Sequence, residues 1–155
     1  MLLKLSQTLR SKKLKLVTAE SCTGGLISAA ITEIAGSSDI FDRGFVTYSN
    51  EAKIAMLGVS PITLETYGAV SEQTAGEMAK GALKNSLGDV AISVTGIAGP
   101  TGGTADKPVG LVYIGVSNKI ETRVFKHMFK GNRNEVRGQT VDVALKHLNN
   151  ILSAS

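Results

Sequence analysis

The chain has 155 residues, 43% of them hydrophobic and 19% charged, which suits one packed globular domain and excludes global disorder. It contains no run of eighteen apolar residues and no signal-peptide pattern at its N-terminus, so we expect neither a membrane-spanning segment nor a secretory leader. The single cysteine, Cys22, excludes a disulfide within the chain and a zinc site of several cysteines, and it favours the reducing cytoplasm.

The net charge of +4 raises the question of a nucleic-acid partner. No aromatic residues are interleaved with the basic residues near the N-terminus, so a stacking platform for single strands is absent. We interpret these basic residues as a solvated helix face and expect no nucleic-acid partner; a small anionic substrate would also suit the charge. They are Lys4, Arg10, Lys12, Lys13 and Lys15.

Hydrophobic periodicity and turn residues predict the elements of the first half of the chain in order. These are a helix over 2–13, a strand over 14–19, a helix over 26–35, a strand over 44–49 and a short helix over 50–57. Asn50 is the expected N-cap of the short helix, and Gly58 and Pro61 are expected to close that segment.

The second half is predicted to contain a helix that begins after Ser71, strands over 89–95, 109–117 and 120–129, and a last helix that begins after Asn132. Residues 96–108 are too rich in Gly and Pro for regular structure. The short turn at 118–119 favours an antiparallel hairpin. Glu135 has the spacing of a capping box from Asn132.

Helices that alternate with apolar strands imply a central sheet covered on both faces. The hairpin makes that sheet mixed rather than purely parallel. No internal repeat or linker is visible in the sequence. We therefore predict an α/β protein, a single-domain three-layer α/β/α sandwich with a mixed central sheet over residues 1–155.

The sequence lacks the G-x-S-x-G, H-E-x-x-H, P-loop and G-x-G-x-x-G signatures. Only two histidines are present, His127 in a predicted strand and His147 on the last helix, and spacing suggests no partner for either. A Ser-His-Asp triad or a histidine-rich metal site is therefore not expected.

Three polar segments directly follow predicted strands, where ligands collect in open α/β sheets. Ser21 stands in the turn 19–25, either as a nucleophile beside oxyanion donors or simply as a capping residue. Lys53 is either an exposed lysine or, if it is buried, a general base with a lowered pKa. The glycine-rich loop 95–103 can present N–H groups to a phosphate or a carboxamide.

A fourth segment, at the start of the last helix, contains Arg133 and Arg137. These arginines either bind a phosphate through paired N–H donors or are ordinary surface charges. If the four segments converge on one edge of the sheet, they form a site for a small, anionic, polar ligand.

Six motifs run in order across essentially the whole chain: T-A-E-S-C-T-G-G (18–25), G-F-V-T-Y-S-N-E-A-K (44–53), G-A-V-S-E (68–72), S-V-T-G-I-A-G-P-T-G-G (93–103), K-P-V-G (107–110) and G-N-R-N-E-V-R (131–137). Together they resemble the C-terminal domain of the CinA family, the competence/damage-inducible proteins A. One departure is Asn132, where the family motif usually has aspartate; either residue caps a helix.

The resemblance implies an amidohydrolase that converts nicotinamide mononucleotide and water to nicotinate mononucleotide and ammonia, without a metal or cofactor and as a homo-oligomer. It implies Ser21 as nucleophile and Lys53 as its partner, with Tyr48 nearby. The residues expected to contact substrate are Thr23, Gly24, Gly25, Thr95, Gly96 and Gly99, together with Arg133 or Arg137 at the phosphate.

In the resulting hypothesis, neutral Lys53 takes the proton of Ser21 as the hydroxyl attacks the carboxamide, and N–H groups near 23–25 hold the oxyanion. Cys22 is the rival nucleophile, because thiolates are favoured at helix N-termini. The alternative function is a catalytically silent module that binds a pyridine nucleotide or a partner in competence or recombination. A basic nucleic-acid binder is the third alternative.

Overall fold

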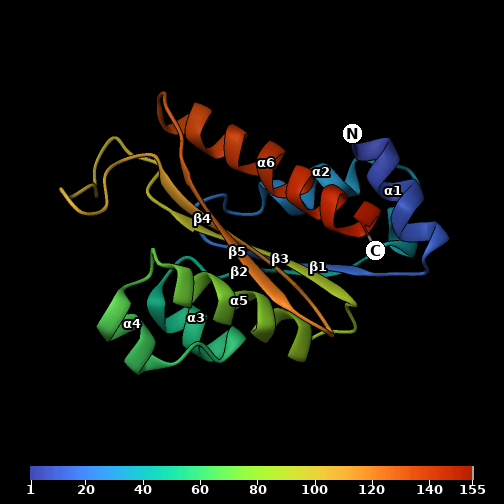
Figure 1. The fold of residues 1–155 in the computed structure, drawn as a ribbon, viewed down its shortest axis with the longest axis horizontal. Helices are drawn as coiled ribbons and strands as arrows, with labels where there is room; N and C mark the ends of the chain where they lie inside the picture. The colour runs from blue at the N-terminus through green and yellow to red at the C-terminus, as the bar shows by residue number, and fades with distance from the viewer. Residues whose placement is uncertain (155) are drawn as a thin grey trace.

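The computed structural model describes residues 1–154, which form a five-stranded sheet with helices on both faces (Figure 1). In chain order the elements are α1 (Leu2–Ser11), β1 (Leu16–Glu20), α2 (Leu26–Thr32), the 3₁₀ helix η1 (Ser37–Asp39), β2 (Phe41–Val46), α3 (Asn50–Leu57), α4 (Pro61–Tyr67), α5 (Glu72–Lys84), β3 (Val90–Gly96), β4 (Leu111–Asn118), β5 (Thr122–Met128) and α6 (Arg133–Ala154).

The sheet is mixed, as the sequence predicted. Its strand order is β2-β1-β3-β4-β5. The first three strands are parallel, whereas β4 and β5 each run antiparallel to the strand before. At its end, Glu20 of β1 pairs with Val46 of β2 on one side and with Val94 of β3 on the other. The segments that follow β1, β2 and β3 therefore leave the sheet at the same edge.

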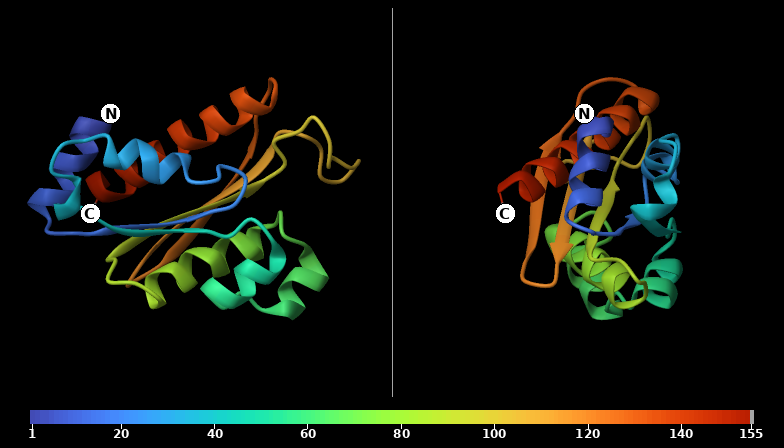
Figure 2. Two further views of the ribbon diagram at one scale, coloured as in Figure 1. Left: turned by 180° about the vertical axis from the view of Figure 1, so that it is seen from behind. Right: turned by 90° about the vertical axis from the view of Figure 1, so that its right-hand side faces the viewer.

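Two helical layers enclose this sheet, which confirms the predicted α/β/α architecture. Helices α1, α2 and α6 cover one face, and α3, α4 and α5 cover the other, as the views in Figures 1 and 2 agree. Strands β1 and β3 are buried along almost their whole length because both of their faces are covered.

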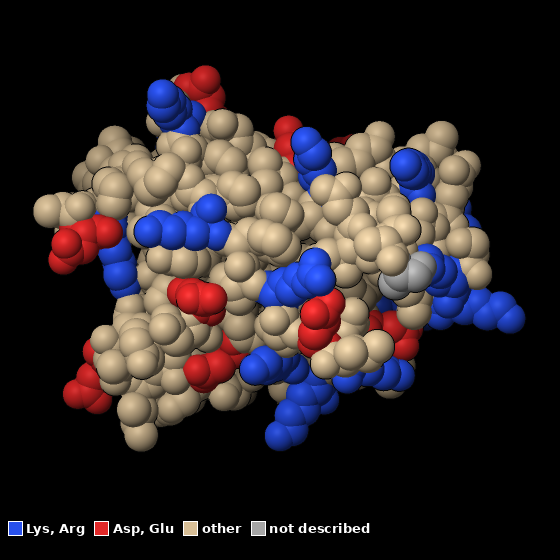
Figure 3. Space-filling model, in the orientation of Figure 1, with Lys and Arg blue, Asp and Glu red and all other residues tan. Residues whose placement is uncertain are grey.

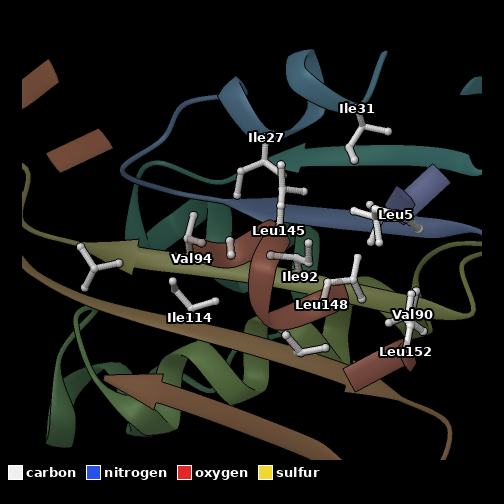
Figure 4. Close-up of a cluster of buried hydrophobic side chains, with 14 of the residues drawn as sticks. Leu5, Ile27, Ile31, Val90, Ile92, Val94, Ile114, Leu145, Leu148 and Leu152 are labelled. Atoms are coloured by element: carbon white, nitrogen blue, oxygen red, sulfur yellow. The ribbon is translucent and has the colours of Figure 1, made fainter. Parts of the chain in front are cut away.

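The larger hydrophobic core lies between the sheet and the α1, α2 and α6 layer. Figure 4 shows Ile27 of α2, Ile92 of β3 and Leu148 of α6 meeting there. All three are fully buried. Burying one such side chain contributes about 1.5–3 kcal/mol to stability, so this core holds α2 and α6 against the sheet. Helix α2 follows the Ser21 turn, and α6 carries Arg133 and Arg137.

Three predictions about the first half of the chain need correction. The strand predicted over 44–49 is β2, Phe41–Val46, because residues 47–49 turn away from the sheet toward α3. Ser49 rather than Asn50 caps α3, with its hydroxyl accepting from the Ala52 N–H. Helix α4 was missed because Pro61 was interpreted as a residue that ends a helix. Pro61 instead lies in the first turn of α4, where an N–H group would have no partner within the helix, so its absence costs nothing.

The capping predictions in the second half are confirmed. The Ser71 hydroxyl accepts from the Thr74 N–H at the start of α5. The Asn132 side chain accepts from the Glu135 N–H at 2.9 Å, and the Glu135 carboxylate accepts from the Asn132 N–H at 3.0 Å. This reciprocal pair is a capping box, and it holds the residues just before Arg133 in place.

The surface gives no support to a nucleic-acid interface on the face seen in Figure 3. Basic and acidic side chains are interspersed there rather than gathered by sign. Among residues 1–154, no helix combines the length and the apolar character needed to cross a bilayer.

Candidate active site

Ser21 and Lys53 meet in the interior although they are far apart in the sequence. Ser21 directly follows β1, and Lys53 lies in the first turns of α3. The Lys53 Nζ lies 3.0 Å from the Ser21 Oγ. Only 1% of the Lys53 surface and 8% of the Ser21 surface are exposed to solvent.

Two backbone carbonyls complete the surroundings of the Lys53 amine. The Nζ lies 2.9 Å from the Thr47 oxygen and 3.2 Å from the Tyr48 oxygen. No acidic side chain of residues 1–154 pairs with it. Burial lowers the pKa of Lys53 below its usual value of 10.5, although the neighbouring Cys22 opposes this shift. A neutral amine has two N–H groups for the two carbonyls and one lone pair for the Ser21 hydroxyl.

The turn that contains Ser21 is built on two glycines with positive φ, Gly24 at 59° and Gly25 at 108°. A side chain at either position would be strained, so the residue type follows from the backbone. The Gly24 N–H donates to the Ser21 carbonyl, and the Gly25 N–H donates to the buried Glu20 carboxylate. These two N–H groups are therefore not free for a ligand, contrary to expectation.

The N–H groups of Cys22 and Thr23 remain as candidate oxyanion donors. Among residues 1–154, neither donates a hydrogen bond to an oxygen atom. Each belongs to a residue within two positions of Ser21 in the chain, so both are candidate donors to a reacting carbonyl.

A small cavity of about 170 Å³ opens onto the Ser21–Lys53 pair. Its wall comes from the ends of β1 and β3, the start of α3, the 69–70 segment and the start of α6. The lining residues are Ser21, Cys22, Tyr48, Lys53, Ala69, Val70, Thr95, Gly96, Ala98 and Arg133. A larger depression of about 580 Å³, lined mostly by apolar surface, adjoins it and shares Ala98 and Arg133.

A sequence profile of the CinA C-terminal domain matches residues 1–152. The chain belongs to the CinA C-terminal domain family. The nicotinamide-nucleotide amidohydrolase PncC of Enterobacter agglomerans is 57% identical to it over 140 residues, which cover 89% of this chain and 85% of PncC.

Other CinA relatives are much longer than the match. The CinA-like protein of Fusobacterium nucleatum subsp. nucleatum is 54% identical over 145 residues, 94% of this chain but 35% of the relative. The chain likewise spans about a third of the competence-damage inducible protein of Caldicellulosiruptor bescii, with 55% identity.

Solved CinA structures share the fold. The competence/damage inducible protein CihA of Agrobacterium tumefaciens has a TM-score of 0.91 at 48% identity, covering 98% of this chain and 95% of that one. The CinA superfamily protein KP700603 of Klebsiella pneumoniae has a TM-score of 0.96 at 34% identity, covering 99% and 96%.

The two arginines of the last CinA motif lie in different surroundings. Arg133 lines the cavity and donates to the Gly99 carbonyl at 2.8 Å and to the Tyr48 hydroxyl at 3.3 Å. Arg137 instead donates to the carbonyls of Cys22 and Thr23, at 3.0 and 3.2 Å. Arg133 is thus available at the mouth of the cavity, whereas Arg137 supports the Ser21 turn.

Tyr48 contributes to the site in two ways. Its carbonyl accepts from Lys53, and its side chain, 64% exposed, stands at the cavity mouth with its hydroxyl on Arg133 rather than on Ser21. Thr95 is almost fully buried and donates to the Ala69 carbonyl at 2.8 Å, which holds the cavity wall.

Of the loop residues that were predicted to contact substrate, some line the cavity and others do not. Thr95 and Gly96 line the cavity, whereas Gly99 touches it only through its bond to Arg133. Thr23 is fully buried, and its hydroxyl donates to Glu20 at 2.6 Å. Ala69, Val70 and Ala98 were not singled out from the sequence, since small apolar side chains have no chemical signature there.

Cys22 lines the cavity, but its thiol is poorly suited to attack. Burial is the main reason that its pKa rises from 9.0 to about 11. Thiolate rather than thiol is the reactive form, so the raised pKa disfavours Cys22 as a nucleophile.

The two histidines lie outside the cavity and contact each other. His127 of β5 and His147 of α6 have their Nε2 atoms 2.8 Å apart. The sequence suggested no partner for either, because the contact joins a strand and a helix that only the fold brings together. Residues 1–154 contain no group of three or more His, Cys, Asp or Glu side chains placed to hold a metal ion.

Proposed function

We propose that this chain is an amidohydrolase that hydrolyses the carboxamide of nicotinamide mononucleotide to nicotinate mononucleotide and ammonia. The observation that carries the proposal is the buried Lys53 amine 3.0 Å from the Ser21 hydroxyl, with carbonyls as its other neighbours. The identity to PncC over most of the length of both chains supports the same activity.

In the first half of the reaction, the Ser21 Oγ attacks the carboxamide carbon while neutral Lys53 accepts the hydroxyl proton. The carbonyl oxygen becomes an oxyanion, for which the Cys22 and Thr23 N–H groups are the proposed donors. Protonated Lys53 then gives its proton to the departing nitrogen, the C–N bond breaks, and ammonia leaves an ester on Ser21.

In the second half, a water molecule attacks that ester and Lys53 accepts the water proton. The C–O bond to Ser21 breaks, the serine oxygen regains a proton from Lys53, and the carboxylic acid product ionises. Lys53 is neutral again at the end, so the pair returns to its starting state.

The two adjoining hollows suit the two ends of this substrate. The 170 Å³ cavity is smaller than the range of about 300–1,000 Å³ that is typical for a whole ligand, so it would hold the pyridine ring and its carboxamide. Ribose and phosphate would extend into the adjoining depression, where Arg133 can donate paired N–H groups to the phosphate. A lone buried thiol fits a cytoplasmic enzyme.

The test is incubation of the purified protein with nicotinamide mononucleotide in the presence of a chelator, with ammonia and nucleotide products identified. Ser21→Ala and Lys53→Met should each lower turnover by at least about a hundredfold. Ser11→Ala and Lys4→Met, on the exposed surface of α1, are the matched controls and should be fully active. Near-normal turnover in either site variant rejects the pair, and binding without ammonia release favours a silent binding module.

A further inference from the structure

The carboxylate of Glu20 is fully buried at the end of β1, directly before Ser21. It accepts five hydrogen bonds. One oxygen receives the Thr23 hydroxyl and the N–H groups of Gly25 and Ile27, and the other receives the N–H and the hydroxyl of Ser28, all between 2.6 and 3.2 Å. A carboxylate has only acceptors, and every one of these five partners is a donor.

These bonds close the N-terminus of α2 from within the protein. The first N–H groups of a helix lack partners in the helix itself and normally face water, a capping side chain or a ligand. Here Glu20 satisfies them and places its negative charge at the positive end of the helix. The carboxylate therefore takes the Gly25 N–H, one of the groups that the sequence analysis expected to hold the oxyanion.

A further contact connects the Glu20 carboxylate to Thr18 of β1 through the Ser28 hydroxyl. The Ser28 hydroxyl donates to Glu20 at 2.7 Å and lies 2.8 Å from the Thr18 hydroxyl, so Thr18 is the donor to Ser28. Gly44 of β2 leaves the space for this pair, because a Cβ there would lie 2.5 Å from the Ser28 oxygen. The donors to the carboxylate thus all follow Ser21, and Thr18 supports one of them, the Ser28 hydroxyl.

Arg137 holds the same turn by donating hydrogen bonds to the backbone carbonyls of the turn. Its guanidinium takes the Cys22 and Thr23 oxygens, while Glu20 takes the donors that follow them. The Cys22 carbonyl and the Thr23 N–H belong to one trans peptide, so they point in opposite directions. Because the carbonyl points toward Arg137, the Thr23 N–H points away from it. Neither Arg137 nor Glu20 contacts the Ser21 hydroxyl, which lies beside Lys53, or the N–H groups of Cys22 and Thr23.

We propose that Glu20 is a positioning residue for the Ser21 nucleophile: its carboxylate fixes the 21–25 turn so that the Ser21 hydroxyl and the Thr23 N–H are presented together. This proposal rests on the proposed function. It assigns Glu20 no contact with substrate, since Glu20 does not line the cavity. Its effect belongs in the chemical step rather than in substrate binding.

The charge of Glu20 has a separate, measurable consequence at Cys22. Glu20 helps to raise the pKa of the Cys22 thiol, together with the dominant effect of burial, while Arg137 and Lys53 lower it. Removing the negative charge should therefore make Cys22 more acidic. This readout needs no enzymatic activity, and it reports the charge of Glu20 through a residue that lines the cavity.

The experiment compares Glu20→Gln and Glu20→Asp with the wild-type protein. The glutamine variant keeps the shape but places an N–H₂ group against donors. We expect its kcat for nicotinamide mononucleotide to fall at least about tenfold with KM within about threefold, and its Cys22 alkylation by iodoacetamide to titrate at lower pH. The aspartate variant keeps the charge but is too short to reach all five donors, so it should lose kcat while its alkylation profile stays near that of the wild type.

A milder variant covers the case in which Glu20→Gln does not fold. Ser28→Ala removes one of the five donors at a partly exposed position and should lower kcat about three- to tenfold without changing KM. Thr32→Ala, one turn further along the same helix, is the matched control and should leave kcat unchanged. Folding of each variant is checked by circular dichroism.

Wild-type kcat in folded Glu20→Gln, or in Ser28→Ala if Glu20→Gln does not fold, overturns the proposal. If the wild-type protein releases no ammonia, the proposed function fails, and the positioning role that rests on it fails with it. If the wild-type protein is active and folded Glu20→Gln keeps the wild-type kcat, only the role of Glu20 fails.

Discussion

The amine of Lys53 lies 3.0 Å from the hydroxyl of Ser21, and no carboxylate of residues 1–154 pairs with that amine. Burial without a counter-charge disfavours the ammonium form, which is why the pKa of Lys53 is lowered from 10.5. The same burial that makes the lysine costly to charge favours the neutral amine that the proposed mechanism requires.

The first prediction concerns the pH dependence of activity. In the proposed mechanism the base is the neutral form of Lys53, which predominates above its pKa, so kcat/KM should rise with pH and level off below pH 10.5. The measurement is initial ammonia release across pH 5 to 10. Lys53→Arg should be inactive throughout, because a guanidinium does not lose its proton in this range. A kcat/KM that is independent of pH from 5 to 9 contradicts the role of Lys53.

The second prediction separates Arg133 from Arg137. Arg133 lines the cavity mouth, so Arg133→Ala should raise KM for nicotinamide mononucleotide about 10- to 100-fold, the effect of a lost charge-assisted hydrogen bond of about 1.5–3 kcal/mol. Arg137 supports the carbonyls of the Ser21 turn, so Arg137→Ala should mainly lower kcat. Steady-state kinetics of both variants provide the comparison.

Nicotinamide riboside, which lacks the phosphate, is the control substrate for the arginine variants. Its kcat/KM should be the same for the wild-type protein and Arg133→Ala. If Arg133→Ala binds the mononucleotide as well as the wild-type protein does, the phosphate is held elsewhere.

The third prediction concerns the His127–His147 contact. Burial lowers the pKa of both histidines below 6.5, and His127 and Lys146 lower that of His147 further. Below pH 6.5 the unfolded chain therefore binds more protons than the folded one, so the free energy of unfolding falls as pH falls through 6.5 toward the lowered pKa values.

Thermal unfolding at pH 7.5 and pH 5.0 tests this linkage. His147→Phe keeps a ring that can stack on Phe125 but cannot titrate, so its loss of Tm between the two pH values should be smaller than that of the wild-type protein. An equal loss of Tm in both proteins would assign the acid sensitivity to other groups.

The fourth prediction uses a pair of glycines. A Cβ at Gly44 would lie 2.5 Å from the Ser28 hydroxyl and 2.7 Å from the Thr18 hydroxyl, so Gly44→Ala should lower the free energy of unfolding by about 1–3 kcal/mol. Gly138 of α6 has nothing within 4 Å of its Cβ position, so Gly138→Ala should raise it by about 0.5–1 kcal/mol. Urea titration of both variants measures the two effects, and a neutral Gly44→Ala would show that the Thr18–Ser28 contact can adjust.

Local patterns were sufficient for much of the fold. The caps at Ser71 and Asn132 and the hairpin of β4 and β5 were predicted because each depends on residues close together in the sequence. Helix α4 was missed because a proline can end a helix or begin one, depending on the turn that it occupies.

By itself the sequence determined the α/β architecture, the mixed sheet and the four segments from which the site is drawn, because periodicity and turn chemistry are local properties. It left Lys53 as either exposed or buried and Arg133 and Arg137 as equivalent. The tertiary structure distinguished these alternatives, burying Lys53 beside Ser21, bringing Arg133 to the cavity and placing Arg137 against the carbonyls of the Ser21 turn. Burial and contacts between distant segments decide the protonation state of a side chain and the groups that it can bind. Burial and such contacts cannot be deduced from the neighbours of a residue in the chain.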